Sequence, residues 1–178
     1  IKSCNKASLL AQGEFLFFLN NDTQLVNGSI DELILTLINN PNAGICGSKL
    51  IYSDGVLQEA GGIIWNDGSA WNYGKYDNAK NPEFNYMRQV DYVSGAALMI
   101  SKELFHKLGQ FNMDYCPAYC EDSDLCLRVR SSGFDVLYQP RSIVIHYEGA
   151  SLGVDENKGI KSFQPVNQKK LFHRWKNV

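Results

Sequence analysis

The chain has 178 residues, of which 44% are hydrophobic and 20% charged, proportions that suit one soluble globular domain with a core of its own. The formal net charge is −2, so we expect no nucleic-acid partner, because such partners select a basic surface. The longest apolar runs, residues 15–19 and 96–100, are too short to cross a bilayer, and the first residues lack the layout of a signal peptide.

The chain contains five cysteines, and an odd number in a domain of this size predicts reduced thiols and a cytoplasmic location. Cys116, Cys120 and Cys126 lie close together among acidic residues, but they lack the paired C-x-x-C spacing of structural zinc sites. We therefore favour buried thiols over a zinc site.

Hydrophobic periodicity in the first 52 residues alternates between helix and strand. Residues 6–12 read as the end of a helix, and residues 14–19 as a buried strand that stops at a polar turn. Residues 28–39 place apolar side chains on one helix face, and residues 43–52 form a second strand. This order predicts an α/β fold with a parallel sheet, in which ligands bind beyond the carboxyl ends of the strands.

A loop-rich segment, residues 61–88, follows this region. Its aromatic residues stand among glycine, asparagine and aspartate, which indicates either a long excursion anchored by buried rings or a binding loop. The remaining elements are predicted as a strand at 90–100, helices at 102–108, 121–132 and 163–175, and strands at 134–138 and 142–146.

Asn20, Asn21, Asp22 and Thr23 follow the first buried strand. Taken alone, this sequence is typical of a turn, because Asn and Asp favour turns. A carboxylate at a strand end can also hold a divalent cation, and Mg²⁺ needs only one or two protein carboxylates where phosphate oxygens complete its shell. His146 ends a predicted strand and could supply a nitrogen ligand to a manganese-like ion, although a lone histidine is more often structural.

Three carboxylates stand within four residues, at Glu121, Asp122 and Asp124. One interpretation is capping of the helix that begins there, since acidic side chains accept backbone N–H bonds and complement the helix dipole. Three carboxylates exceed what one cap requires, and crowded carboxylates repel unless a cation or a raised pKa relieves them. A carboxylate held there could act as a general base toward a hydroxyl.

Four segments resemble the family 2 glycosyltransferases, inverting enzymes with the GT-A fold, and in particular the rhamnosyltransferase-like members that build bacterial surface polysaccharides. They are GEFLFFLNNDT at 13–23, VSGAALMI at 93–100, YCEDSDLCLR at 119–128 and VIH at 144–146. The resemblance implies a Rossmann-like GT-A domain over residues 1–150, with a mixed, mainly parallel sheet flanked by helices. Residues 151–178 would form a C-terminal tail, which the pattern allows to be helical.

The resemblance also implies a donor site. Asn20, Asn21 and Asp22 occupy the position of the family's D-x-D motif, with Asn20 in place of the first acidic residue. Asp22 would hold a divalent cation, Mn²⁺ or Mg²⁺, that bridges the diphosphate of the donor. His146 matches a histidine that completes the metal site in some members.

The other two segments imply the sugar pocket and the base. Gly95 and Ala96 match a loop that lines the donor-sugar pocket, and Asp122 matches the aspartate that serves as general base, with Glu121 beside it. These roles imply transfer of a sugar, with inversion, from a nucleotide-sugar donor to a hydroxyl of a glycan or lipid-linked acceptor.

A second hypothesis is a catalytically degenerate module that binds a sugar or a partner. Asn20 favours it, as does the absence of the nucleotide-binding strand and helix with which family members start; Asp22, Asp122 and His146 favour the enzyme. We expect the chain alone to be weakly active or inactive. The basic segment 163–175 could touch the inner face of an anionic membrane, although we favour a solvated helix.

Overall fold

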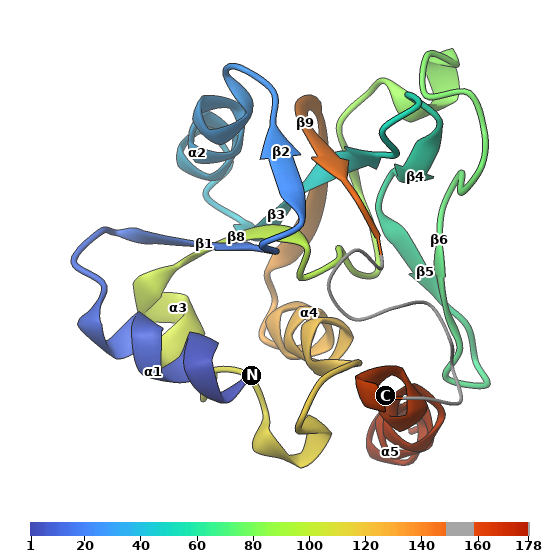
Figure 1. Ribbon diagram of the computed structural model, residues 1–178. Helices are drawn as coiled ribbons and strands as arrows, with labels where there is room; N and C mark the ends of the chain where they lie inside the picture. Colours follow the sequence, from blue (N-terminus) through green and yellow to red (C-terminus); the bar gives the residue numbers. More distant parts are fainter. Residues whose placement is uncertain (149–158, 178) are drawn as a thin grey trace.

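A computed structural model describes residues 1–148 and 159–177, so the predicted start of the tail, residues 151–158, lies outside the described residues (Figure 1). The strands are β1 (Phe15–Leu19), β2 (Thr23–Leu25), β3 (Ala43–Ile51), β4 (Leu57–Glu59), β5 (Gly62–Ile64), β6 (Ala70–Asn72), β7 (Arg88–Gln89), β8 (Ala97–Ser101) and β9 (Asp135–His146). The α-helices are α1 (Lys2–Leu10), α2 (Ser29–Asn39), α3 (Lys102–Lys107), α4 (Glu121–Ser131) and α5 (Gln164–Trp175). Short 3₁₀ helices cover Pro82–Phe84, Met113–Tyr115 and Gly159–Phe163.

The main sheet is mixed and flanked by helices, as predicted, but most of its pairings are antiparallel. Its strands run in the order β1-β8-β3-β9-β2, with β4 beside β3 and β7 beside β9. Within the described residues, β3 and β9 make the single parallel pairing. The prediction of a mainly parallel sheet is therefore wrong for this chain. Apolar runs indicate that a segment is a buried strand, but they carry no information about the direction of its partner.

Two predicted strand boundaries also differ from the structure. β9 is one continuous strand where two were predicted. Its register against β3 shifts between Ser48 and Lys49, opposite Gln139 and Ile143, and this irregularity lies between the two predicted strands. Pro140 lies in this irregular stretch, where its missing N–H costs no ladder bond. The predicted strand at 90–100 is reduced to β8, and the residues before it form a loop that reaches the site described below.

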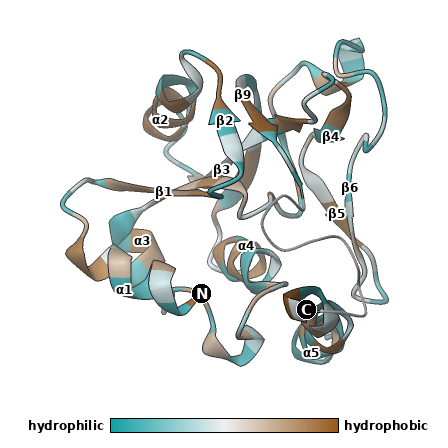
Figure 2. Ribbon diagram, in the orientation of Figure 1, coloured by the Kyte–Doolittle hydropathy of each residue, from teal (hydrophilic) through white to brown (hydrophobic). Residues whose placement is uncertain are grey.

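Helices cover both faces of the sheet. α2 packs on one face, and α3 and α4 pack on the other (Figure 1). Figure 2 shows hydrophobic residues on β1 and β9 of the sheet and on α2, which packs against it. The buried side chains on the α2 side include Leu33, Leu37, Cys46, Met99 and Leu137, and those on the opposite side include Ile45, Ile100, Phe105, Leu125 and Val129.

Helix α5 packs against the domain, next to α4 (Figure 1). Asn167 is fully buried, and its amide donates to three backbone carbonyls of the 115–119 loop. Near the end of the helix, Trp175 and Arg174 both contact a carboxylate oxygen of Asp124, at 3.0 and 3.1 Å. The segment is therefore helical, and one of its faces is buried rather than solvated. In the described part of the chain, the helices are too short or too polar to span a membrane.

Candidate active site

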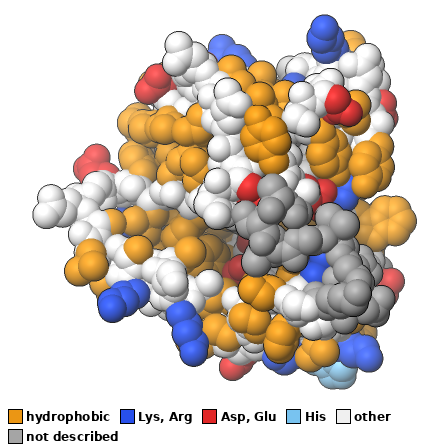
Figure 3. All heavy atoms as spheres, viewed as in Figure 1, with side chains coloured by type: hydrophobic (Ala, Val, Ile, Leu, Met, Phe, Trp, Pro, Cys, Tyr) orange, Lys and Arg blue, Asp and Glu red, His pale blue; other side chains and the backbone are white. Residues whose placement is uncertain are grey.

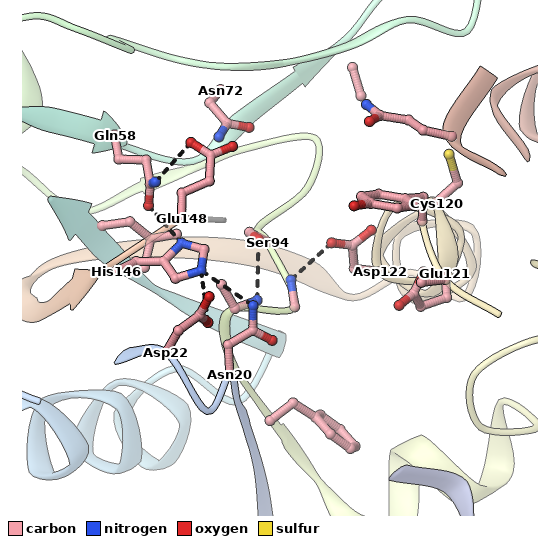
Figure 4. Close-up of a pocket in the computed structure, with 18 of the residues that line it drawn as sticks. Asn20, Asp22, Gln58, Asn72, Ser94, Cys120, Glu121, Asp122, His146 and Glu148 are labelled. Carbon is pink, nitrogen blue, oxygen red and sulfur yellow. Dashed lines mark hydrogen bonds and ion pairs between the residues drawn. The ribbon is translucent and has the colours of Figure 1, made fainter. Parts of the chain in front are cut away.

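Asp22 and His146 come together through the pairing of β2 with β9, which places Thr23 opposite His146 (Figure 4). The backbone N–H of Tyr147 donates to the carbonyl of Asp22 at 2.9 Å, and the Thr23 hydroxyl donates to the carbonyl of Asn20 at 2.6 Å. These bonds fix the turn between β1 and β2. Asp22 Oδ1 then lies 3.4 Å from His146 Nε2, and both side chains are largely buried.

The predicted donor-binding residues surround this pair. The backbone N–H of Asn20 donates to the carbonyl of Ala96 at 3.0 Å, which joins the β1–β2 turn to the loop before β8. Asn20 Nδ2 lies 3.4 Å from His146 Nε2. Asn21 is exposed on the same turn, and it lines one pocket together with Gly95 and Ala96. The structure therefore brings these predicted residues to one place.

The loop at 94–96 is held between two carboxylates. The backbone N–H of Ser94 donates to Glu59 Oε1, and that of Gly95 donates to Asp122 Oδ2, both at 2.9 Å. Glu59 is 1% exposed, and burial, together with the nearby charge of Asp122, raises its pKa to about 8. Figure 4 shows this loop between Asp22 and His146 on one side and Asp122 on the other.

Asp122 stands at the start of α4. The two residues before the helix, Tyr119 and Cys120, adopt left-handed backbone conformations, with φ of 77° and 69°, so the chain turns sharply into the helix. Asp122 Oδ1 accepts from the backbone N–H of Ser123 at 2.7 Å, while Oδ2 accepts from Gly95. These two hydrogen bonds orient the carboxylate, which also lines the pocket.

The two neighbouring carboxylates differ from Asp122. Burial, and then the charge of Asp122, raises the pKa of Glu121 to about 7, and its Oε2 is buried without a hydrogen-bond partner among the described residues. Asp124 is fully buried and binds Arg128 Nε at 2.8 Å, in addition to its contacts with Arg174 and Trp175 of α5. Asp124 is therefore a structural residue, which leaves Glu121 and Asp122 for chemistry.

Residues of the β1–β2 turn, the 94–96 loop, the start of α4 and the β5–β6 hairpin line one open pocket of about 660 Å³. Figure 3 shows carboxylate side chains at the centre of this face. Trp71, from the hairpin, is 64% exposed and also lines the pocket. In the predicted loop 61–88, Trp65, Tyr76 and Tyr86 are exposed as well, so most of its aromatic rings do not anchor it. Trp71 in particular fits the binding-loop interpretation.

The sequence matches the family described as "Glycosyltransferase like family 2" over residues 8–159. The chain belongs to this family. It is 31% identical over 158 residues to the O-antigen biosynthesis protein RfbC of Myxococcus xanthus, a match that covers 85% of this chain and 12% of that protein. It is 28% identical over 153 residues to the N-acetylglucosaminyl-diphospho-decaprenol L-rhamnosyltransferase of Mycobacterium tuberculosis, over 80% of this chain and 50% of that protein.

A solved structure shares the fold. The crystal structure of GalNAc-T7 with UDP, GalNAc and Mn²⁺ superposes with a TM-score of 0.72 over 98% of this chain and 34% of that one, at 13% identity. The family match and this likeness confirm the predicted family and the GT-A fold. The chain therefore carries a glycosyltransferase-family domain, and it spans half or less of the length of these relatives.

Two donor atoms in the pocket could form part of an open metal site. Residues 1–148 and 159–177 contain no group of three or more His, Cys, Asp and Glu side chains arranged to enclose a metal ion. Asp22 and His146 do offer one oxygen and one nitrogen, both directed at the pocket, and a cation bound there would need phosphate oxygens and water to complete its shell. Cys120 also lines the pocket, but burial and the nearby carboxylates raise its pKa to about 12, so the thiol stays protonated.

The sequence patterns did not reveal three polar residues that support the site. Glu59 holds the 94–96 loop, while Gln58 and Glu148 line the pocket on the Nδ1 side of His146 (Figure 4). Gln58 and Glu59 are 2% and 1% exposed. Adjacent polar residues that are both buried are unusual, because a buried polar group must find partners inside the protein. The sequence carries no signal of that burial, since β4 is only three residues long.

Proposed function

We propose that this glycosyltransferase domain transfers a sugar, with inversion and with the help of a divalent cation, from a nucleotide-sugar donor to a hydroxyl of a glycan or lipid-linked acceptor during bacterial surface-polysaccharide synthesis. One observation carries the proposal. Asp22 and His146 stand on one wall of a single pocket, and Asp122 stands on the other.

The names of the relatives support the substrate classes. The M. tuberculosis relative is named as a rhamnosyltransferase that acts on a sugar linked to a decaprenol diphosphate, and the M. xanthus relative as an O-antigen biosynthesis protein. GalNAc-T7 was solved with UDP, GalNAc and Mn²⁺. A lipid-linked or glycan acceptor and a nucleotide-sugar donor are the simplest extension of these names to this chain.

The residues of the donor wall would hold the leaving group. A divalent cation, when bound, supplies the positive charge that a nucleoside diphosphate needs in order to leave. Asp22 and His146 would hold that cation, and the 94–96 loop would place the donor sugar next to it. Asn20 joins the two, since its backbone binds Ala96 and its amide faces His146.

The opposite wall would activate the acceptor. Asp122 would accept the proton of the acceptor hydroxyl while that oxygen attacks the anomeric carbon on the face opposite the diphosphate, which inverts the configuration. Burial raises the pKa of Glu121 to about 7, so Glu121 would place less negative charge beside Asp122 than an exposed glutamate would. At the rim, Trp71 offers an aromatic face on which the C–H groups of an acceptor sugar can stack.

Calorimetric titration would test the proposal. Nucleoside diphosphates and nucleotide sugars would be titrated into the full-length parent protein with and without Mn²⁺, beside the Asp22→Ala variant. Asp31→Ala, which removes an exposed carboxylate on α2, is the matched control. We expect binding to require both Mn²⁺ and Asp22. Binding that is indifferent to both would remove Asp22 from the metal site and favour the degenerate binding module.

A further inference from the structure

We propose that Gln58 is a positioning residue that holds His146 in the tautomer whose free nitrogen faces Asp22. Gln58 lies in β4 and lines the pocket next to the Nδ1 side of the imidazole, the side opposite Asp22 (Figure 4). The proposal rests on the proposed function only for its consequence, which is binding of a divalent cation by Asp22 and His146. The hydrogen bonds that carry it stand on their own.

The first step is the orientation of the Gln58 amide. Its Nε2 lies 3.2 Å from Glu148 Oε2, and an ionised carboxylate can only accept hydrogen bonds. That oxygen also accepts from the Tyr52 hydroxyl at 3.0 Å, and Lys75 Nζ lies 3.6 Å away, which keeps the carboxylate in place. The NH₂ group of Gln58 must therefore point at Glu148, which turns its carbonyl oxygen toward His146.

The second step is the imidazole. His146 Nδ1 lies 2.8 Å from Gln58 Oε1. Because an amide oxygen only accepts, the hydrogen must be on Nδ1, and a neutral ring then carries its lone pair on Nε2. Nε2 is 3.4 Å from Asp22 Oδ1 and 3.4 Å from Asn20 Nδ2. The lone pairs of Nε2 and Asp22 thus converge, as two ligands of one cation would.

The third step is burial. Gln58 is 2% exposed, so water cannot easily replace its bond to Nδ1. Without that bond, a neutral imidazole favours the opposite tautomer, with hydrogen on Nε2, and would donate to Asp22 instead of leaving both atoms free. The hydrogen bonds from Gln58 to Glu148 and from His146 to Gln58 therefore decide whether Nε2 is free to bind a metal or is occupied by a hydrogen bond to Asp22.

The tautomer can be measured without any metal. We would label the full-length protein with ¹⁵N-histidine, record the two-bond ¹H–¹⁵N couplings of the imidazole rings in metal-free buffer, and assign His146 by its loss in His146→Gln. We expect the Nδ1–H tautomer in the unmodified protein. A His146 ring with hydrogen on Nε2, alone or on both nitrogens, would overturn the proposal.

Variants separate positioning from packing. Gln58→Met keeps the volume but removes the acceptor, and we expect hydrogen to move to Nε2 and Mn²⁺ affinity to fall about 10- to 100-fold. The double variant Gln58→Glu, Glu148→Gln exchanges the two groups but keeps an acceptor at Nδ1, so it should restore the Nδ1–H tautomer. Gln139→Met is the matched control, because Gln139 is also a buried glutamine and bonds Thr36.

The outcomes distinguish this inference from the proposed function. A tautomer that stays on Nδ1 in Gln58→Met would overturn the role of Gln58, as would an equal loss of Mn²⁺ affinity in Gln139→Met. If the unmodified protein fails to bind Mn²⁺, the proposed metal site is wrong. The spectra still decide whether Gln58 sets the tautomer.

Discussion

The two walls of the pocket meet the same physical requirement, an oriented polar group in a partly buried place, in opposite ways. On the wall where we propose that a cation binds (the metal wall), Asp22 Oδ1 and His146 Nε2 lie 3.4 Å apart. On the wall that carries the proposed general base (the base wall), both oxygens of Asp122 accept backbone N–H bonds. The first arrangement leaves room for a cation between the two side chains, whereas the second orients a carboxylate by backbone hydrogen bonds alone.

The walls also differ in what builds them. The metal wall depends on strand pairing, because Thr23 and His146 stand opposite each other in the sheet although they are far apart in the chain. The base wall depends on one local event, the turn through Tyr119 and Cys120 into α4. The 94–96 loop lies between the two walls and is held by hydrogen bonds to Glu59 and Asp122. A substitution that leaves the loop in place should therefore change one wall without the other.

The largest effect should come from Asp122→Asn. Asparagine has one acceptor oxygen, which can keep the Gly95 N–H bond and hold the loop while the Ser123 bond is lost, and the proposed general base is removed. We expect kcat to fall by about 10²- to 10⁴-fold, with Mn²⁺-dependent donor affinity unchanged. Steady-state turnover and calorimetry of the full-length protein measure the two quantities. Loss of donor affinity in parallel with turnover would show that the walls do not act separately.

Asp124→Asn should act on stability instead. It removes a buried charge that binds Arg128 and Arg174, and we expect the free energy of unfolding to fall by roughly 3–5 kcal/mol. Urea unfolding measures it, with Asp122→Asn as the matched control, for which we expect a loss of about 1 kcal/mol or less. Equal losses in the two variants would contradict the division of the acidic cluster into a structural and a chemical part.

Glu59→Gln should change how stability depends on pH. The folded pKa of Glu59, about 8, lies above its ordinary value of 4.5, so between these values the folded state binds more protons than the unfolded state. The free energy of unfolding should therefore fall as pH rises through this window, by up to about 1.4 kcal/mol per pH unit.

The glutamine variant should lose most of that slope, and Glu121 should keep a remnant of it below its own pKa of about 7. Urea unfolding at several pH values between 5 and 8 would check this. Glu14→Gln, at an exposed glutamate, is the control. An unchanged slope in Glu59→Gln would mean that Glu59 is ionised in the folded protein.

The smallest effect should come from Asn20→Asp. It restores the acidic residue of the D-x-D pattern next to His146, and we expect Mn²⁺ affinity to rise roughly 3- to 10-fold, because added ligand charge strengthens cation sites. Asn21→Asp adds the same charge one residue away and is the control in the same calorimetric titration. An equal gain in both variants would indicate a diffuse electrostatic effect rather than a ligand at position 20.

The sequence by itself determined the main helices and the residues with chemical potential. The helices at 28–39 and 121–132 were predicted within a residue at each end, since an apolar face and a stop signal are local properties. The motifs around Asp22, Asp122 and His146 were equally local, and the family match covers all three. The structure places Asp22, Asp122 and His146 in one pocket, and their chemical roles stay predictions that the experiments above would test.

Only the tertiary structure decided strand direction, the continuity of β9 and the polar groups that support the site residues. Whether β8 runs parallel or antiparallel to β3 depends on partners distant in the chain, and periodicity reports only that a strand is buried. In the sequence, Gln58 and Glu59 are ordinary polar residues. In the folded sheet they are buried, and they bond His146 and Ser94. Burial makes their hydrogen bonds obligatory, and burial is a property of the whole fold.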